Sequence, residues 1–301
     1  MTTRQKILVI IGPTSSGKSA LAIELARKFN GEVISADSRQ VYKGLNIGTG
    51  KITKKEMGSV RHHLLDVAWP KKIFTAQNFV VQGRKAIADI AARGKLPIVA
   101  GGTGFYIDTL LGRIALPDVP PNQELRAKLE QKTIKQLFAL LKSKDPRRAR
   151  SIDSHNKRRL IRALEIVSAL GKVPNNDLRG RYSILWIGLS APIKILEKEI
   201  LIRLRVRIRG GMVGEARWLH KAGLTYRRME QLGLEYRALA RHLQGKISHD
   251  QMVHELNHNI RRYAKRQLTY WKRNRSIHWF NPMRREKICK LVGMWLRTSG
   301  R

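Results

Sequence analysis

Two segments near the amino terminus combine residue types that can bind a phosphate group and move a proton. The first, Gly12-Pro13-Thr14-Ser15-Ser16-Gly17-Lys18-Ser19, has the spacing of a P-loop. In such a loop, backbone N–H groups and the lysine hold phosphate oxygens, and the serine hydroxyl coordinates Mg²⁺. The second segment, Asp37-Ser38-Arg39-Gln40-Val41-Tyr42, begins with a carboxylate. The pair predicts a protein that binds a phosphorylated substrate beside an acidic side chain.

The flanking residues predict the elements that would position these groups. The apolar run Ile7 to Ile11 reads as a buried parallel strand, and a helix is expected from Ala20 to Ala26. A second strand, residues 31–37, ends on Asp37. Since ligands of parallel α/β sheets bind at the carboxyl ends of the strands, we expect Asp37 beside the P-loop. A plain turn or helix-capping aspartate is the structural alternative.

Other nucleotide-binding signatures are missing. A third strand, residues 96–100, runs into Gly101-Gly102-Thr103-Gly104, which lacks the spacing of a dinucleotide fingerprint. Among the predicted apolar strands, only the one that ends at Asp37 has an acidic residue in the position of the Walker B aspartate of motor proteins and GTPases. The P-loop is therefore expected to serve another chemistry than nucleotide-driven motion.

Composition points to a polyanionic partner. Sixty lysine and arginine residues stand against 22 aspartate and glutamate residues, a formal net charge of +38 at pH 7. Such an excess favours nucleic acid, although an anionic membrane surface could also select for it. The single cysteine excludes a disulfide framework, and neither a signal peptide nor a membrane span is recognisable. A soluble cytoplasmic protein is expected.

Farther along the chain, helical patterns dominate. We predict an all-α insertion over residues 117–182 within a P-loop core formed by residues 1–116 and 183–301, with Asp145 capping a helix that starts at Pro146. Residues 203–209 alternate like a strand but also fit a helical stripe, and we favour the helix. Ser248 opens a capping box for a long basic helix. The fold class is α/β, a P-loop NTPase-like core with a parallel sheet flanked by helices, plus the insertion.

Ordered blocks over nearly the whole chain resemble the tRNA dimethylallyltransferase family. Besides the P-loop and the Asp37 segment they include Ile47-Gly48-Thr49, the glycine run at 101–104, Arg159-Leu160-Ile161-Arg162, Gly211-Met212-Val213-x-Glu215-Ala216, Leu232-Gly233-Leu234-Glu235-Tyr236 and Ala264-Lys265-Arg266-Gln267. Gly50-Lys51-Ile52 departs from the family's usual Ala-Lys-Pro. The resemblance implies transfer of a dimethylallyl group from dimethylallyl diphosphate to N6 of the adenosine 3′-adjacent to the anticodon of tRNA.

The resemblance also implies roles for individual residues. Asp37 would be the general base, and the diphosphate would bind to Gly12, Thr14, Ser15, Ser16, Gly17, Lys18 and Ser19, with Ser19 on Mg²⁺. The tRNA anticodon stem-loop would contact Ser38, Arg39, Gln40, Thr103, Arg126, Arg158, Arg159, Arg162, Lys265, Arg266 and Gln267. No obligate protein partner is implied, and a monomer is expected.

Two other functions fit parts of the sequence. A small-molecule kinase could use the P-loop with ATP and Asp37 as base, but it has no need of the basic charge. An RNA-binding factor switched by nucleotide would need base-reading motifs that the sequence lacks. For His62 and His63 we expect a structural or hydrogen-bonding role, because no nucleophile or metal-ligand set lies near them in the sequence.

Overall fold

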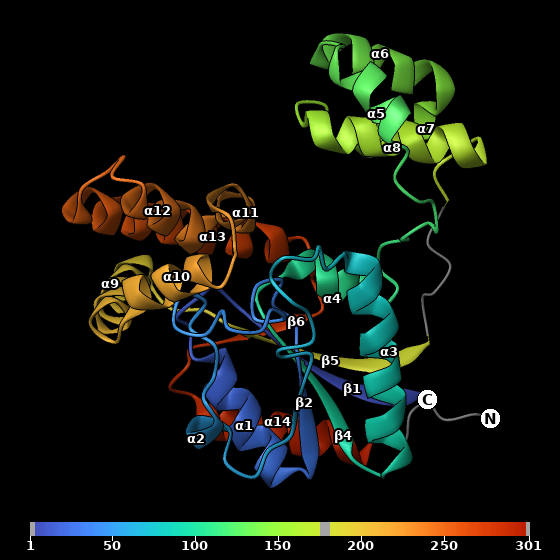
Figure 1. The fold of residues 1–301 in the computed structure, drawn as a ribbon. Helices are drawn as coiled ribbons and strands as arrows, with labels where there is room; N and C mark the ends of the chain where they lie inside the picture. The colour runs from blue at the N-terminus through green and yellow to red at the C-terminus, as the bar shows by residue number, and fades with distance from the viewer. Residues whose placement is uncertain (1–3, 175–180, 299–301) are drawn as a thin grey trace. The chain divides into compact units, whose positions relative to one another are not determined.

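A computed structural model describes residues 4–174 and 181–298 of the chain. Its sheet has six parallel strands in the order β3-β2-β4-β1-β5-β6 (Figure 1). The strands are β1 (Gln5–Ile11), β2 (Gly31–Ser35), β3 (His62–His63), β4 (Leu96–Ala100), β5 (Tyr182–Leu189) and β6 (Ile277–Phe280). The predicted parallel sheet is confirmed.

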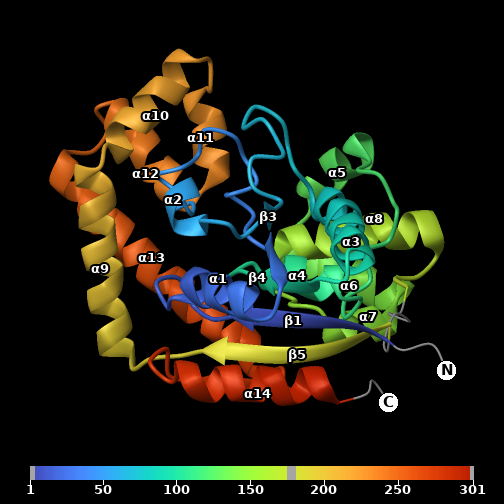
Figure 2. The same cartoon turned by 90° about the horizontal axis from the view of Figure 1, so that it is seen from below.

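Strand β1 lies inside the sheet and is apolar on both faces. Ile7, Val9 and Ile11 pack with side chains of α3 (Ala76–Ala92) and α4 (Gly104–Leu110). Leu8 and Ile10 pack on the opposite face with α1 (Lys18–Lys28) and α14 (Arg285–Arg297), which runs beside β5 (Figure 2). Since alternate residues of a strand point to opposite faces, a continuous apolar run is what a strand covered on both sides requires.

Five helices form a second hydrophobic core in the same part of the chain. They are α9 (Ile193–Arg209), α10 (Met212–Lys221), α11 (Tyr226–Leu232), α12 (Leu234–Leu243) and α13 (His249–Lys272). Val41, Tyr42 and Leu45, from the loop that follows β2, are buried in this core. The loop that carries the Asp37 segment is thereby fixed to the helices, and the short helix α2 (Lys54–Met57) follows it.

The ambiguous segment 203–209 is helical, as predicted. Leu196, Ile200 and Leu204 are buried along one side of α9, so the four-residue repeat outweighs the two-residue alternation. The capping box at the start of α13 is also present: Gln251 N–H donates to Ser248 Oγ at 3.2 Å, and the Gln251 side chain accepts from Ser248 N–H. Local sequence signals therefore determine both helices.

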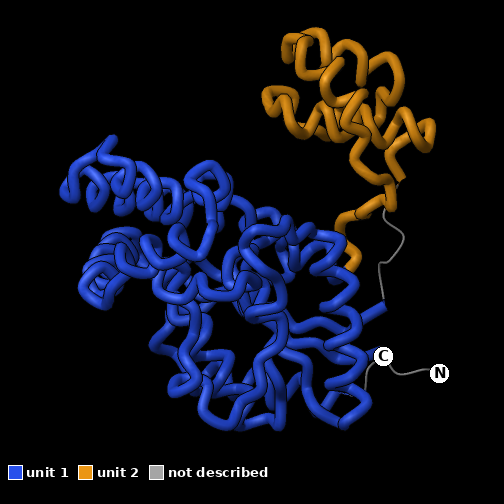
Figure 3. Tube along the Cα trace, viewed as in Figure 1, with its two compact units in different colours: residues 1–111, 180–301 blue, residues 112–179 orange. Residues whose placement is uncertain are grey.

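The chain divides into two compact units, residues 1–111 with 180–301 and residues 112–179 (Figure 3). The second unit contains α5 (Gln123–Glu130), α6 (Ile134–Lys144), α7 (Pro146–Ser151) and α8 (Lys157–Leu170) around its own leucine-rich core. Asp145 caps α7 as predicted, accepting from Arg148 N–H and Val173 N–H, each at 2.9 Å. In the described ranges, no helix is long and apolar enough to cross a membrane.

Candidate active site

The P-loop and the Asp37 segment open into one cavity of about 1320 Å³. The P-loop follows β1, the Asp37 segment follows β2, and Gly101-Gly102 follows β4, so all three come from carboxyl ends of neighbouring strands. Residues 46–47 and 49–53 and residues of α1, α9, α12 and α13 also line it. The expectation that the sheet edge brings Asp37 to the P-loop cavity is met.

The P-loop has polar groups that find no hydrogen-bond partner among the described residues. Helix α1 begins at Lys18, and no side chain caps its first turn. The buried Ser16 hydroxyl has no hydrogen-bond partner in the part of the chain that the structure describes. A buried hydroxyl without a partner is costly, and an anion bound in the loop would satisfy it. The loop is thus suited to a phosphate or diphosphate group.

Lys18 carries the cationic group of the loop. Its Nζ donates to the Pro13 carbonyl oxygen at 2.5 Å, within the same loop. Burial lowers the pKa of the Lys18 amine to about 8, although the nearby Asp37 carboxylate acts in the opposite direction. A group that loses its proton near pH 8 makes anion binding sensitive to alkaline pH.

Affinity for inorganic pyrophosphate should therefore fall as the pH rises through about 8. The pKa of Lys18 is lowered in the free protein, so the ammonium form is fully present below that pH and is lost above it. One-proton linkage gives a loss of about fivefold between about pH 8 and pH 9. Isothermal titration across this range measures it. Lys18→Arg, which stays charged, should lack this step, and a step of equal size in that variant would contradict the assignment.

Asp37 is held in a defined orientation by its own segment. Its Oδ1 accepts from the backbone N–H of Arg39 at 2.8 Å and of Gln40 at 3.3 Å. The second oxygen, Oδ2, accepts no hydrogen bond from the described residues. Oδ1 thus has the role of a turn-stabilising aspartate, whereas Oδ2 is available to a substrate in the cavity.

The neighbours of Asp37 are bound to the loop between β4 and α4 and to the loop at residues 46–50. Ser38 N–H donates to Thr103 Oγ1 at 3.1 Å, and Gln40 Nε2 donates to the carbonyl oxygens of Thr49 and Gly50, each at 3.4 Å. Ser38, Arg39 and Gln40 line the cavity. These predicted residues are therefore brought together at the Asp37 side of the cavity.

Gln267, for which an RNA contact is expected, bridges two loops of the cavity. Its Oε1 accepts from Thr14 N–H at 2.8 Å, and its Nε2 donates to the Gly102 carbonyl oxygen at 3.0 Å. Only 5% of the residue is exposed. A Cβ atom at Gly102 would collide with the Gln267 amide, so the glycine allows α13 to approach. The side chain amide fixes the P-loop against α13.

Gln267→Leu should weaken pyrophosphate binding about tenfold, because it leaves the Thr14 N–H and the Gly102 carbonyl without their partner. Titration calorimetry on pyrophosphate, with tRNA affinity measured in parallel, checks this. Gln267→Glu keeps an acceptor for Thr14 but loses the donor to Gly102 and adds a negative charge beside the P-loop, so it should weaken pyrophosphate binding at least as much. Loss of tRNA affinity with unchanged pyrophosphate affinity would show that Gln267 acts on the RNA.

The two other predicted residues of α13 lie outside the cavity. Lys265 and Arg266 are exposed, with Lys265 Nζ 4.0 Å from Glu197 and the Arg266 guanidinium 5.8 Å from the centre of the Tyr263 ring. Neither residue lines the cavity. They form part of a basic helix surface, which suits contact with phosphates better than contact with a reacting group.

The predicted arginines of the second unit fall into two kinds. Arg126 forms a bidentate ion pair with the buried Glu165, from Nε to Oε1 at 2.8 Å and from Nη2 to Oε2 at 2.7 Å. Arg162 Nη1 lies 3.3 Å from Oε2 of the same carboxylate. Arg158 and Arg159 are exposed near the start of α8. Arg126 links α5 to α8, and Arg162 ties its own helix to the loop before α5 by donating to the Val119 carbonyl oxygen at 2.7 Å, whereas Arg158 and Arg159 are open to solvent.

Several cavity residues were not predicted. Arg203 and Arg207 lie one helical turn apart on α9, and both line the cavity together with Glu235 and Tyr263. Arg207 Nη1 lies 3.4 Å from Glu235 Oε1, and burial raises the pKa of Glu235 while Arg207 opposes that rise. The four-residue spacing of the arginines was visible in the sequence, but its direction toward the P-loop was not.

The paired histidines belong to the sheet. His63 Nε2 lies 2.8 Å from Glu32 Oε2, and this buried carboxylate also binds Arg93 and Lys95. His62 Nδ1 lies 2.9 Å from the Val60 carbonyl oxygen. Neither histidine lines the cavity, so the contacts are those of hydrogen-bonding residues in β3.

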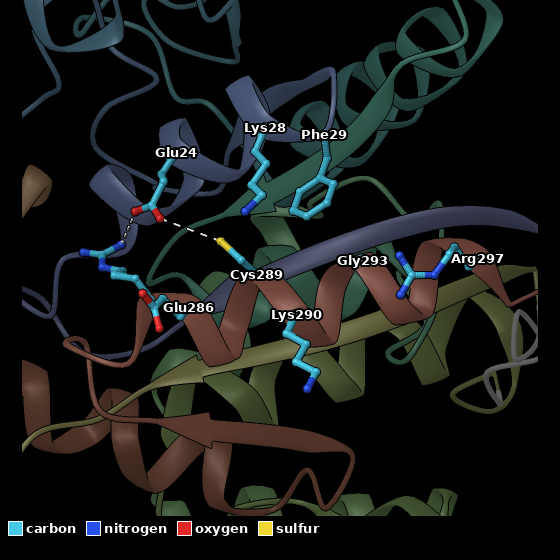
Figure 4. A pocket seen from close by; sticks show the side chains of 9 residues that line it. Glu24, Lys28, Phe29, Glu286, Cys289, Lys290, Gly293 and Arg297 are labelled. Carbon is cyan, nitrogen blue, oxygen red and sulfur yellow. Dashed lines mark hydrogen bonds and ion pairs between the residues drawn. The ribbon is translucent and has the colours of Figure 1, made fainter.

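A second, smaller hollow lies between α1 and α14 (Figure 4). Cys289 Sγ donates to Glu24 Oε1 at 3.8 Å there, and Arg285 pairs with the same carboxylate at 3.4 Å. Lys28, Phe29, Glu286, Lys290, Gly293 and Arg297 also line it. No P-loop or Asp37-segment residue does, and its volume of about 440 Å³ is a third of the main cavity's.

The glycine-rich loop between a buried parallel strand and a helix defines a P-loop protein, with an acidic residue at the neighbouring strand end. A family model described as IPP transferase matches residues 40–274. The chain is 40% identical to the tRNA dimethylallyltransferase of Geobacillus thermodenitrificans, covering 96% of this chain and 94% of that protein. It is 42% identical to the tRNA dimethylallyltransferase 2 of Treponema denticola, covering 91% and 93%. The chain belongs to the IPP transferase family.

Solved structures agree with this assignment. The crystal structure of the full-length tRNA isopentenylpyrophosphate transferase from Bacillus halodurans is 32% identical, with a TM-score of 0.75 over 97% of both chains. A eukaryotic dimethylallyltransferase acting on tRNA has a TM-score of 0.81 at 27% identity, over 92% of this chain and 74% of that one. The P-loop NTPase-like fold is therefore shared across the full described core.

Proposed function

We propose that this enzyme transfers a dimethylallyl group from dimethylallyl diphosphate to N6 of the adenosine 3′-adjacent to the anticodon of tRNA. The observation that carries the proposal is the shared cavity of the P-loop and Asp37. A phosphate-binding loop faces a carboxylate that has one oxygen without a partner among the described residues. The names of the family relatives supply the reaction that this pair of groups would serve.

The P-loop would hold the diphosphate. The Ser16 hydroxyl, the Lys18 ammonium and backbone N–H groups near the start of α1 would bind its oxygens and stabilise their charge as the diphosphate leaves. Arg203, across the cavity, adds a further positive charge. Ser19, whose hydroxyl is exposed in the first turn of α1, would hold a Mg²⁺ ion, and the ion would neutralise charge on the diphosphate.

Asp37 would act as general base. N6 of adenosine attacks the allylic carbon, the bond between that carbon and the diphosphate oxygen breaks, and the N6 proton passes to Asp37 Oδ2. The products are N6-dimethylallyl adenosine and diphosphate. Oδ1 stays bound to the Arg39 and Gln40 N–H groups and keeps the carboxylate aimed. A positioned base contributes about 10²–10⁴-fold to such a step.

The RNA would bind through its backbone and one extruded base. An adenine amine inside a stacked loop cannot reach a cavity, so the base must leave the stack. Ser38, Arg39, Gln40 and Thr103 would surround it. Lys265 and Arg266 on α13, with Arg158 and Arg159 of the second unit, would contact phosphates, and Arg126 and Arg162 would shape that surface through Glu165. The net charge of +38 supports RNA as partner.

We propose that the protein acts as a monomer in the cytoplasm, since the scheme assigns no step to a second copy of the chain.

Transfer of label from dimethylallyl diphosphate to an anticodon stem-loop tests the proposal. Incubation with Mg²⁺ and carbon-labelled donor should place label on the RNA, and γ-labelled ATP should transfer none. A control stem-loop with another base in place of the target adenosine should stay unlabelled. Stoichiometric phosphoryl transfer from ATP, without need of the prenyl donor, would instead establish a kinase.

A further inference from the structure

Glu215, on α10, is bound to the loop that forms one wall of the active-site cavity. Its Oε2 accepts from the backbone N–H groups of Asn46 at 2.9 Å and Ile47 at 2.7 Å, and its Oε1 accepts from that of Gly48 at 2.9 Å. Three successive N–H groups thus converge on one carboxylate, an arrangement otherwise used to bind external anions. Here the anion is part of the protein.

A buried tyrosine completes the contact from the other side. Tyr236 Oη donates to Glu215 Oε1 at 2.7 Å, and only 1% of Tyr236 is exposed. A Cβ atom at Gly48 would lie 2.6 Å from Tyr236 Oη, so only glycine allows the loop to sit this close. Glu215, Tyr236 and Gly48 therefore form one closely packed, hydrogen-bonded cluster.

The loop held in this way reaches the catalytic segment. Arg207 Nη1 donates to the Gly48 carbonyl oxygen at 2.8 Å. Gly48 is therefore held at both of its backbone groups, the N–H by Glu215 and the carbonyl by Arg207. The carbonyls of Thr49 and Gly50 accept from Gln40, three residues after Asp37. Asn46, Ile47, Thr49 and Gly50 themselves line the cavity. A displacement of the loop would therefore move both the cavity wall and the Asp37 segment.

We propose that Glu215 is a positioning residue for the transfer reaction: it holds residues 46–48 by their N–H groups and so sets the cavity wall and the orientation of the Asp37 segment. This inference rests on the proposed function for its kinetic consequence. Glu215 makes no hydrogen bond with a P-loop residue in the described part of the chain, so diphosphate binding should not depend on it. That separation distinguishes positioning from general structural support.

Glu215→Gln is the primary test, because it replaces one acceptor oxygen by an NH₂ group, which cannot accept from the loop N–H groups or from Tyr236. We expect kcat to fall about 10–100-fold, since a misplacement of about 1 Å can cost about 100-fold. Pyrophosphate affinity should change little, and the melting temperature should fall by only a few degrees, because donors left without an acceptor cost about 1–3 kcal/mol. Hydrogen exchange at the amides of Asn46, Ile47 and Gly48 should speed up, with the rest of the protein unchanged.

Gly48→Ala approaches the same contact from the loop side and should give the same pattern, which keeps the test valid if Glu215→Gln folds poorly. Tyr236→Phe leaves the loop hydrogen bonds in place and should be milder. Glu286→Gln, an exposed carboxylate on α14, is the matched control and should stay within about twofold of wild type.

Two outcomes would overturn the proposal. In one, Glu215→Gln and Gly48→Ala retain wild-type kcat although the loop amides exchange faster. In the other, pyrophosphate affinity, melting temperature and kcat all fall together, which is the pattern of a purely structural contact. If the wild-type enzyme itself transfers no dimethylallyl group, the proposed function fails, while hydrogen exchange and pyrophosphate binding still report on the loop contact.

Discussion

Replacing Asp37 by asparagine is expected to lower kcat for dimethylallyl transfer by about 10²–10⁴-fold, the usual contribution of a positioned base. Asparagine retains an Oδ1 that can accept from Arg39 and Gln40 N–H, so the turn should persist. What disappears is the oxygen that would take the N6 proton. The loss should therefore appear in kcat, with the affinities for tRNA and diphosphate close to wild type.

Single-turnover transfer with saturating tRNA and donor measures this step, and filter binding gives the tRNA affinity. Asp250→Asn, at an exposed acid in the first turn of α13, is the matched control and should leave kcat within about twofold. Wild-type kcat in Asp37→Asn would remove Asp37 from the proton transfer and leave it only as a turn residue.

Replacing Lys18 by methionine is expected to lower kcat/KM for dimethylallyl diphosphate by about 10²–10³-fold, as for removal of one charged or hydrogen-bonding group that stabilises a developing anion. Methionine approximates the length and apolar stem of lysine, so the packing of the first turn of α1 should survive. The deficit should be larger for the donor than for tRNA, because Lys18 belongs to the P-loop.

Steady-state kinetics with varied donor, supported by pyrophosphate titration, provide the measurement. Lys290→Met, an exposed lysine on α14, removes the same charge at a distance and serves as control. Equal pyrophosphate affinity in Lys18→Met and wild type would place the diphosphate elsewhere in the cavity.

Local patterns in the sequence were sufficient for the elements around the P-loop. Strand β1, helix α1, strand β2 and the long helix α13 each follow from a continuous run, a four-residue repeat or a cap within a few residues. Strand β6 was not predicted, because its four residues carry too little periodicity to stand out. It is recognisable only through its pairing with β5.

The contacts that hold the site could not be predicted, since they join residues far apart in the chain. Gln267 reaches Thr14 across 253 positions, and Glu215 reaches Gly48 across 167. The resemblance implies RNA contacts for Gln267 and Arg126, and it gave no sign of their partners within the protein. Those partners are the Thr14 and Gly102 backbone for Gln267 and the buried Glu165 for Arg126.

In the proposed reaction, the P-loop cavity brings a prenyl diphosphate and a tRNA base together beside Asp37. Mass spectrometry of nucleosides, after incubation of the protein with Mg²⁺, dimethylallyl diphosphate and unmodified tRNA, tests it most directly. We expect an adenosine heavier by one dimethylallyl group, attached at N6 and located next to the anticodon, with at most a trace formed by Asp37→Asn in the time that the wild type needs for full conversion. An unmodified adenosine after exhaustive incubation with the wild-type protein would contradict it.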